Sequence, residues 1–259
     1  MDIAVILILF LLGISVGSFL NVVADRVPAR ESIVRPPSHC FNCGHELEPR
    51  DLVPVFSYLI LRGKCRYCGR PFSVRSMLVE LAAGLLFALA FFTFGVTWQL
   101  APALIFISFY IILFITDLEQ GILPHVIVYP GIALALIIAL LSPLTGTLPG
   151  TISSLEGLAV SYGFFFLLWA LPRLFKKSVL DYGDVGMAGL IGASVGFPQV
   201  LVALYIAILA GALTAAILIL WKLKKFNEPL QFGVFLAAGG LVALFWGSEI
   251  IDAYSMLLR

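Results

Sequence analysis

The feature that most constrains this chain is a series of apolar runs, most of them close to 20 residues long. About 20 apolar residues in an α-helix cross the ~30 Å hydrocarbon core of a bilayer. Lipid offers the backbone no hydrogen bonds, so a span has to be a helix or part of a closed barrel. We predict an all-α, polytopic membrane helix bundle of about eight spans, at residues 3–23, 77–95, 99–116, 122–141, 155–171, 184–197, 199–220 and 231–250.

Two of the eight apolar runs differ from a typical internal span, one in its length and the other in its position at the N-terminus. The run at 184–197 is short for a span, which leaves a count of six or seven spans open. The first run follows "MDIAV", which lacks the basic segment of a cleavable signal peptide, so we expect it to remain as a membrane helix. Gly13 and Gly17 form a G-x-x-x-G on this helix and offer a helix-packing face.

Basic residues predict the orientation. Lys and Arg gather in the segment 24–76 and in the loops that precede the sixth and eighth runs, whereas the loop 142–153 has none. Eight spans place all three basic segments on one side, which the positive-inside rule makes cytoplasmic. The residues are Arg26, Arg30, Arg35, Arg50, Arg62, Lys64, Arg66, Arg70, Arg75, Arg173, Lys176, Lys177, Lys222, Lys224 and Lys225; only Arg259 lies elsewhere.

All four cysteines lie in the polar segment 24–76, as Cys40–Cys43 and Cys65–Cys68. Two C-x-x-C pairs typically complete a tetrahedral zinc site, and a closed set of four thiolates is structural. Disulfides are rare in the reducing cytoplasm, while an iron–sulfur site and metal-free or redox cysteines stay open as alternatives. His39 and His45 flank the pairs, and we expect them to be neighbours of the site.

Two aspartates stand at predicted span ends. Asp117 ends the third span and Asp184 begins the sixth, so both are expected at the cytoplasmic depth of the membrane. Ionisable groups at membrane depth are costly and mark candidate functional sites. Two adjacent carboxylates share one proton, which is the arrangement of an aspartic peptidase. The alternative is that each acid is an interfacial helix cap.

The residues named above lie in longer stretches of sequence that are typical of one protein family. "GSFLNVVADRVP", "DLVPVFSYLILRGKCRYC", "SVRSMLVELAAGLLF", "TDLEQGILPHVIVYPG", "YGDVGMAGLIGASVG" and "LQFGVFLAAGG" cover most of the chain. Together they resemble the bacterial type IV prepilin peptidases, which are leader peptidases and N-methyltransferases with a G-x-G-D motif.

The resemblance implies a function. Asp117 and Asp184 would be the catalytic pair, and the four cysteines would bind structural zinc. The substrate would be a type IV prepilin or type II secretion pseudopilin, cut after a Gly, and S-adenosylmethionine would then methylate the new N-terminus. Residues 1–23 would be the first span, 24–76 the zinc loop and 77–259 the peptidase domain. We expect an inner-membrane protein that contacts lipid and binds no nucleic acid.

Three positions depart from the family pattern: Asp181 replaces the first Gly of G-x-G-D, Gly186 a usual Lys, and His125 a common Asp. A catalytically degenerate adaptor therefore remains a rival, as does a proton-coupled transporter. Glu80 matches a recurrent family Glu and is a candidate for binding the methyl donor or supporting the site. No glycine-rich loop marks a methyl-donor site.

Overall fold

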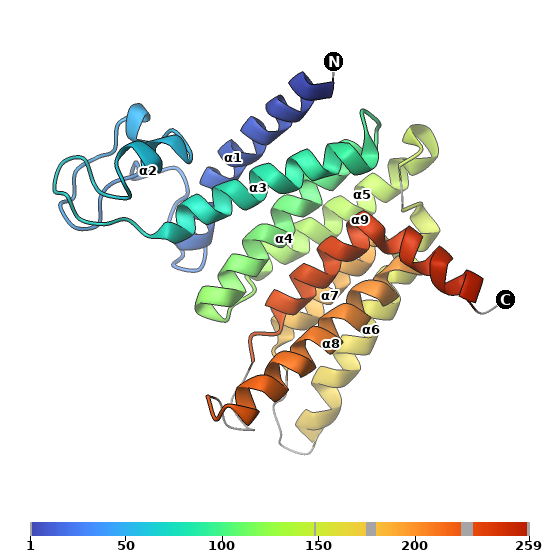
Figure 1. The fold of residues 1–259 in the computed structure, drawn as a ribbon. Helices are drawn as coiled ribbons and strands as arrows, with labels where there is room; N and C mark the ends of the chain where they lie inside the picture. Colours follow the sequence, from blue (N-terminus) through green and yellow to red (C-terminus); the bar gives the residue numbers. More distant parts are fainter. Residues whose placement is uncertain (1, 148, 175–179, 224–229, 258–259) are drawn as a thin grey trace. The chain divides into compact units, whose positions relative to one another are not determined.

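The computed structural model describes residues 2–147, 149–174, 180–223 and 230–257. Within these ranges the chain is helical, which confirms the predicted all-α class (Figure 1). Of the basic residues used to predict orientation, Lys176, Lys177, Lys224, Lys225 and Arg259 lie outside the described residues. The chain divides into two compact units, residues 1–95 and 96–259.

The first unit is a pair of helices joined by the cysteine-containing insert. The helices are α1 (Asp2–Arg26) and α3 (Val74–Phe94), and the insert carries the 3-10 helix η1 (Pro49–Asp51) and the short α2 (Phe56–Ile60). In Figure 1, α1 and α3 lie side by side.

Small residues set the spacing of this pair, as the G-x-x-x-G predicted. A Cβ on Gly13 would lie 2.6 Å from the Ala83 carbonyl oxygen, and one on Gly17 would lie 2.8 Å from the Glu80 Cα. The side chain of Asn21 donates to the carbonyl of Ser76 at 3.1 Å. The contacts advance four residues at a time along α1 and go back three or four at a time along α3, so the helices are antiparallel and packed backbone to backbone.

The second unit is a bundle of six helices. They are α4 (Leu100–Gln120), α5 (His125–Thr145), α6 (Thr151–Leu174), α7 (Tyr182–Val195), α8 (Gln199–Leu220) and α9 (Gly233–Leu257). In Figure 1, α7 lies among α5, α6, α8 and α9, and these neighbours bury every residue from Gly183 to Val195. Hydroxyl groups tie α7 to the bundle: Tyr110 bonds Ser194, and Ser154 donates to the Ala193 carbonyl at 2.6 Å.

Seven described helices are long and apolar enough to cross a membrane: α1, α3, α4, α5, α6, α8 and α9. The sixth predicted run, 184–197, forms α7, which has 14 residues and is therefore about 21 Å long. The short run is thus the buried centre of the second unit. The structure groups α3 with α1, while the division into a zinc loop and a peptidase domain stays a prediction.

Candidate active site and metal centre

Asp117 lies in the last turn of α4, in a sequence that ends one helix and starts the next. Gly121 is left-handed and its N–H donates to the Asp117 carbonyl at 2.8 Å, which terminates α4. Pro124, four residues after the last residue of α4, is then the extended N-cap of α5. The acid is therefore fixed at a helix end, and only 4% of its surface is exposed.

The carboxylate of Asp117 meets the first turn of α9. The N–H of Val234 donates to Asp117 Oδ2 at 2.9 Å, and the N–H of Gly233 also faces the carboxylate. The first N–H groups of a helix lack intrahelical partners and carry the positive end of its dipole. Asp117 thus fills the role of a cap for a helix that begins far along the chain.

Asp184 lies in the first turn of α7 and is 5% exposed. It forms a capping box with Asp181: the Asp181 N–H donates to Asp184 Oδ2 at 3.2 Å, and the Gly183 N–H donates to Asp181 Oδ2 at 3.3 Å. The alternative role in helix capping is therefore present in the structure. It does not exclude a chemical role, because the capping bond holds the carboxylate in a fixed position.

Leu123 links the two acids. A Cβ on Gly183 would lie 2.8 Å from Leu123 Cβ, and one on Gly233 would lie 3.0 Å from Leu123 Cδ1 and 2.9 Å from Asp117 Cγ. The two helix N-termini therefore converge on one leucine. The acids are close enough for the charge of Asp117 to act on Asp184, and that of Asp181 acts on both. The helix ends that carry the two predicted acids thus meet at Leu123.

The three departures from the family pattern have distinct surroundings. Gly186 faces Val128, where a Cβ would lie 3.0 Å from a Val128 methyl carbon, so this position serves helix packing. The His125 ring packs against the rings of Tyr129 and Tyr182 at centroid distances of 5.4 and 5.8 Å. Asp181 is exposed at the N-terminus of α7.

The four cysteines form one compact cluster, with all four sulfur atoms within 4.8 Å of one another. The two pairs fold alike: the Cys40 N–H bonds the His45 carbonyl, and the Cys65 N–H bonds the Arg70 carbonyl. Gly44 and Gly69, which follow the pairs, have φ values of 69° and 71°, in the left-handed region that glycine tolerates. Each cysteine pair with its following glycine thus forms a tight turn, called a knuckle here, and the cluster could hold a metal ion.

Sulfur geometry and chemistry both fit such an ion. Tetrahedral ligands at about 2.3 Å from a metal lie about 3.8 Å apart, which is the distance between Cys40 Sγ and Cys68 Sγ, 3.8 Å. Hydrogen bonds from the N–H groups of Cys43 and Asn42 lower the pKa of Cys40 to about 6. The His45 N–H favours the Cys43 thiolate, but burial and neighbouring sulfurs outweigh it and raise the pKa of Cys43 to about 11. A cation would relieve this crowding of negative charge.

The histidines beside the cysteines lie outside the cluster, as expected. The His45 ring stacks on Tyr67 at 3.6 Å between centroids, and the His39 ring contacts Phe41 at 5.3 Å. Tyr67 belongs to the second cysteine pair, so its contact with His45 joins the two knuckles.

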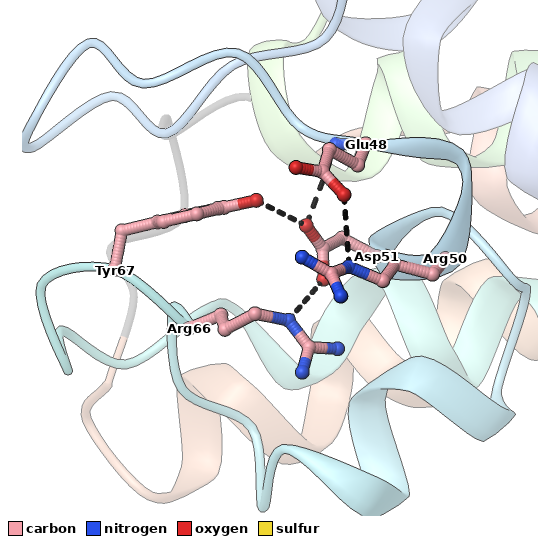
Figure 2. A network of polar contacts seen from close by, with 5 residues as sticks. All are labelled: Glu48, Arg50, Asp51, Arg66 and Tyr67. Atoms are coloured by element: carbon pink, nitrogen blue, oxygen red, sulfur yellow. Dashed lines mark hydrogen bonds and ion pairs between the residues drawn. The ribbon is translucent and has the colours of Figure 1, made fainter.

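Asp51 fastens the second knuckle to the chain that leaves the first. Its side chain is 2% exposed and accepts hydrogen bonds from Arg66 Nε at 2.6 Å, the Tyr67 hydroxyl at 3.1 Å and the Glu48 N–H at 3.4 Å (Figure 2). Burial alone would raise the pKa of Asp51, but these bonds outweigh it and hold the pKa below its ordinary value. The role of Asp51 was not predictable from the sequence, because nothing there distinguishes it from the other charged residues of the segment 24–76.

Removing the Asp51 charge should weaken metal retention. We expect Asp51→Asn to release metal about 10- to 100-fold faster, since groups that orient metal ligands typically affect affinity by this factor. The measurement is metal transfer from the purified full-length protein to a chromogenic chelator. Glu48→Gln is the matched control: it removes the charge from the exposed Glu48–Arg50 ion pair, 2.9 Å long, and should leave the rate unchanged. Equal rates in both variants would refute the role of Asp51.

Comparison with known proteins identifies the family. The bacterial peptidase A24 N-terminal domain matches residues 11–94, and the type IV leader peptidase family matches residues 104–216. A prepilin leader peptidase/N-methyltransferase of Bacillus subtilis is 32% identical to this chain over 247 residues. The matched region covers 95% of this chain and 96% of that relative. This chain belongs to the type IV leader peptidase family.

Two further family relatives carry the same printed name. The Pseudomonas aeruginosa protein is 33% identical over 97% of this chain and 93% of its own length. The Myxococcus xanthus protein is 40% identical over 82% of this chain, which spans 62% of that relative. No solved structure matches the chain. The two family models fall within the two compact units, the first on α1, the insert and α3, and the second on α4 to α8.

Proposed function

We propose that this protein is an aspartic endopeptidase that removes the basic leader from type IV prepilins or type II secretion pseudopilins after a Gly. The observation that carries the proposal is that Asp117 and Asp184 are both buried in the second unit, close to helix ends that meet at Leu123. The family supplies the substrate class, since its relatives are named prepilin leader peptidases. The capping contacts of both acids give the pair the fixed geometry that proton transfer requires.

The pair acts by sharing a proton. The charged carboxylate takes a proton from water, whose oxygen attacks the scissile carbonyl carbon, while the protonated carboxyl gives its proton to the carbonyl oxygen. The tetrahedral intermediate then collapses, the C–N bond breaks, and a proton passes to the leaving amine. The two acids titrate as a unit, so neither Asp117 nor Asp184 is assigned one fixed role.

The proposal includes the bound groups and the placement in the membrane. Cys40, Cys43, Cys65 and Cys68 would hold one structural zinc ion, because four thiolates leave no open position for substrate. S-adenosylmethionine would supply the methyl group for the new N-terminus, as the relatives' name implies. The described residues offer no feature that identifies where this cofactor binds. The concentration of Lys and Arg supports a cytoplasmic side for the insert and both acids.

The direct test is reconstitution of the purified protein with a prepilin in liposomes. Mass spectrometry of the product should show cleavage after the Gly and, with S-adenosylmethionine present, an added methyl group. An intact prepilin, with the protein correctly inserted, would contradict the peptidase. Cleavage without methylation would contradict only the second activity.

The packing around Asp117 gives a sharper test of the site. A Cβ at position 233 would lie 2.9 Å from Asp117 Cγ, closer than real contacts allow, so Gly233→Ala should displace the carboxylate. A shift of about 1 Å typically costs about 100-fold in rate, and we expect a loss of that order in leader removal. Gly163→Ala is the control, because nothing lies within 4 Å of its added Cβ. Normal cleavage by Gly233→Ala would argue against Asp117 as a catalytic group.

Asp181 is proposed as a positioning residue. Asn can cap α7 as Asp does, whereas Ala cannot, and loss of such a cap costs about 1 kcal/mol. We therefore expect Asp181→Asn to retain most leader removal and Asp181→Ala to lose about fivefold, the factor in rate that corresponds to about 1 kcal/mol. The measurement is the rate of cleavage across pH, because Asp181→Asn also removes a charge beside the pair. Abolished cleavage in Asp181→Asn would instead make Asp181 one of the catalytic acids.

A further inference from the structure

The insert presents apolar side chains to its surroundings over residues 52–60. Five large apolar side chains in this segment are between 41% and 75% exposed. On α2, positions 56, 59 and 60 have the spacing that places side chains on one side of a helix, and Leu52 and Val53 lie in the turn before it. We call this group the 52–60 face; it consists of Leu52, Val53, Phe56, Leu59 and Ile60.

The opposite side of the segment is tied down, which keeps the 52–60 face outward. Val55 is buried and its N–H donates to Glu80 Oε2 on α3 at 2.7 Å. Val55 has a φ of 63°, a conformation that β-branched residues rarely adopt, so the surroundings hold this backbone in place. Tyr58 packs over Gly63, where an added Cβ would lie 2.7 Å from its hydroxyl. The apolar face therefore cannot turn inward without breaking these contacts.

The hydrogen bond between Val55 and Glu80 also indicates how deep the segment 52–60 lies in the membrane. At the charged end of α1 and α3, Arg75 pairs with Asp25 at 2.8 Å. Glu80 lies five residues further along α3, about 7.5 Å deeper at 1.5 Å per residue. Interfacial helices bury their apolar face about 5–10 Å into the boundary between headgroups and acyl chains. Because α3 is a candidate span, the hydrogen bond from the Val55 N–H to Glu80 is expected to hold Val55 at the boundary between headgroups and acyl chains.

Two exposed basic residues, Arg62 and Lys64, follow the segment directly. Among the ion pairs of the described residues, neither has an acidic partner. Basic residues next to a membrane-bound segment attract anionic headgroups. We infer that the 52–60 face is a membrane-docking surface, which lies in the acyl boundary of the leaflet that α3 enters, with Arg62 and Lys64 among anionic headgroups.

Photo-crosslinking of the full-length protein tests this inference without depending on peptidase activity. Benzoylphenylalanine replaces Ile60, which is 75% exposed, in protein reconstituted into phosphatidylglycerol liposomes. The control carries the same group at Phe41, which is 89% exposed in the first knuckle and lies between two of the metal-site cysteines. We expect lipid adducts at position 60 at several times the yield at position 41. Metal content equal to that of the wild type shows that the insert is folded.

The outcomes separate lipid from protein as the occupant of the face. A crosslink from position 60 to protein, either to this chain or to an added prepilin, would overturn the inference, and so would equal lipid yields at positions 60 and 41. The basic residues are tested in the same assay. Arg62→Gln with Lys64→Gln should reduce the adduct yield in phosphatidylglycerol and leave it unchanged in phosphatidylcholine. An unchanged yield in phosphatidylglycerol would overturn the headgroup contact.

Discussion

Asp117→Asn and Asp184→Asn should each abolish leader removal, with a fall in rate of at least about 1000-fold. General acid–base groups contribute about 100- to 10,000-fold each, and an amide can neither take a proton from water nor give one to the carbonyl oxygen. Residues that act as one unit are not additive, so the double variant should be no worse than either single variant. The measurement is cleavage of a prepilin by reconstituted protein under single-turnover conditions.

These substitutions preserve the local structure, so a loss of activity would report on chemistry. The amide oxygen of Asn at position 117 can still accept the Val234 N–H, and Asn at position 184 can still accept the Asp181 N–H. Asp252→Asn, at an exposed position near the end of α9, is the matched control and should cleave normally. Asn can replace an acid that only caps a helix. Cleavage by either variant would therefore show that the replaced acid is a helix cap and not a catalytic group.

The pairing of these acids shows how far the sequence alone leads. Span directions predicted that Asp117 and Asp184 lie at one depth, and in the structure both are buried close to Leu123. What positions Asp117 was not predictable, because its bond to the Val234 N–H joins residues 117 positions apart and depends on how α4 packs against α9. The stretch "LQFGVF" was recognised as family-like, yet nothing in it indicates that its N–H groups face an acid.

The surroundings of the short sixth run were also beyond the sequence. Lipid is as apolar as leucine, so hydropathy cannot separate a lipid-facing helix from one enclosed by other helices. The structure shows that α7 is buried from Gly183 to Val195. A signal exists in retrospect, since this run is rich in Gly and Ala, which permit close helix packing. Asp51 gave none, because its partners, Arg66 and Tyr67, are defined only when both knuckles have folded.

Replacing Cys65 by Ser should remove the metal and unfold the insert. Between residues 27 and 73 the buried apolar side chains are Cys40, Val55 and Cys65, and so small a set cannot hold a fold by burial alone. A metal bound by the four cysteines would then be the main link between the two knuckles, as in small domains that are unfolded without zinc. We expect zinc content to fall from about one ion per chain to near zero, since a structural site needs four ligands.

Limited trypsin digestion measures the unfolding. We expect rapid cleavage in Cys65→Ser, or after chelation of wild-type protein, at the basic residues beside and between the second pair of ligands, which are Arg62, Lys64, Arg66 and Arg70. Glu48→Gln serves as the control and should resist trypsin like the wild type, because it keeps all four thiolates and removes only the charge of an exposed ion pair. Since α1 and α3 pack through their own small residues, both should remain protected. A Cys65→Ser protein that retains zinc and resists trypsin would show that the insert folds without the four-thiolate site.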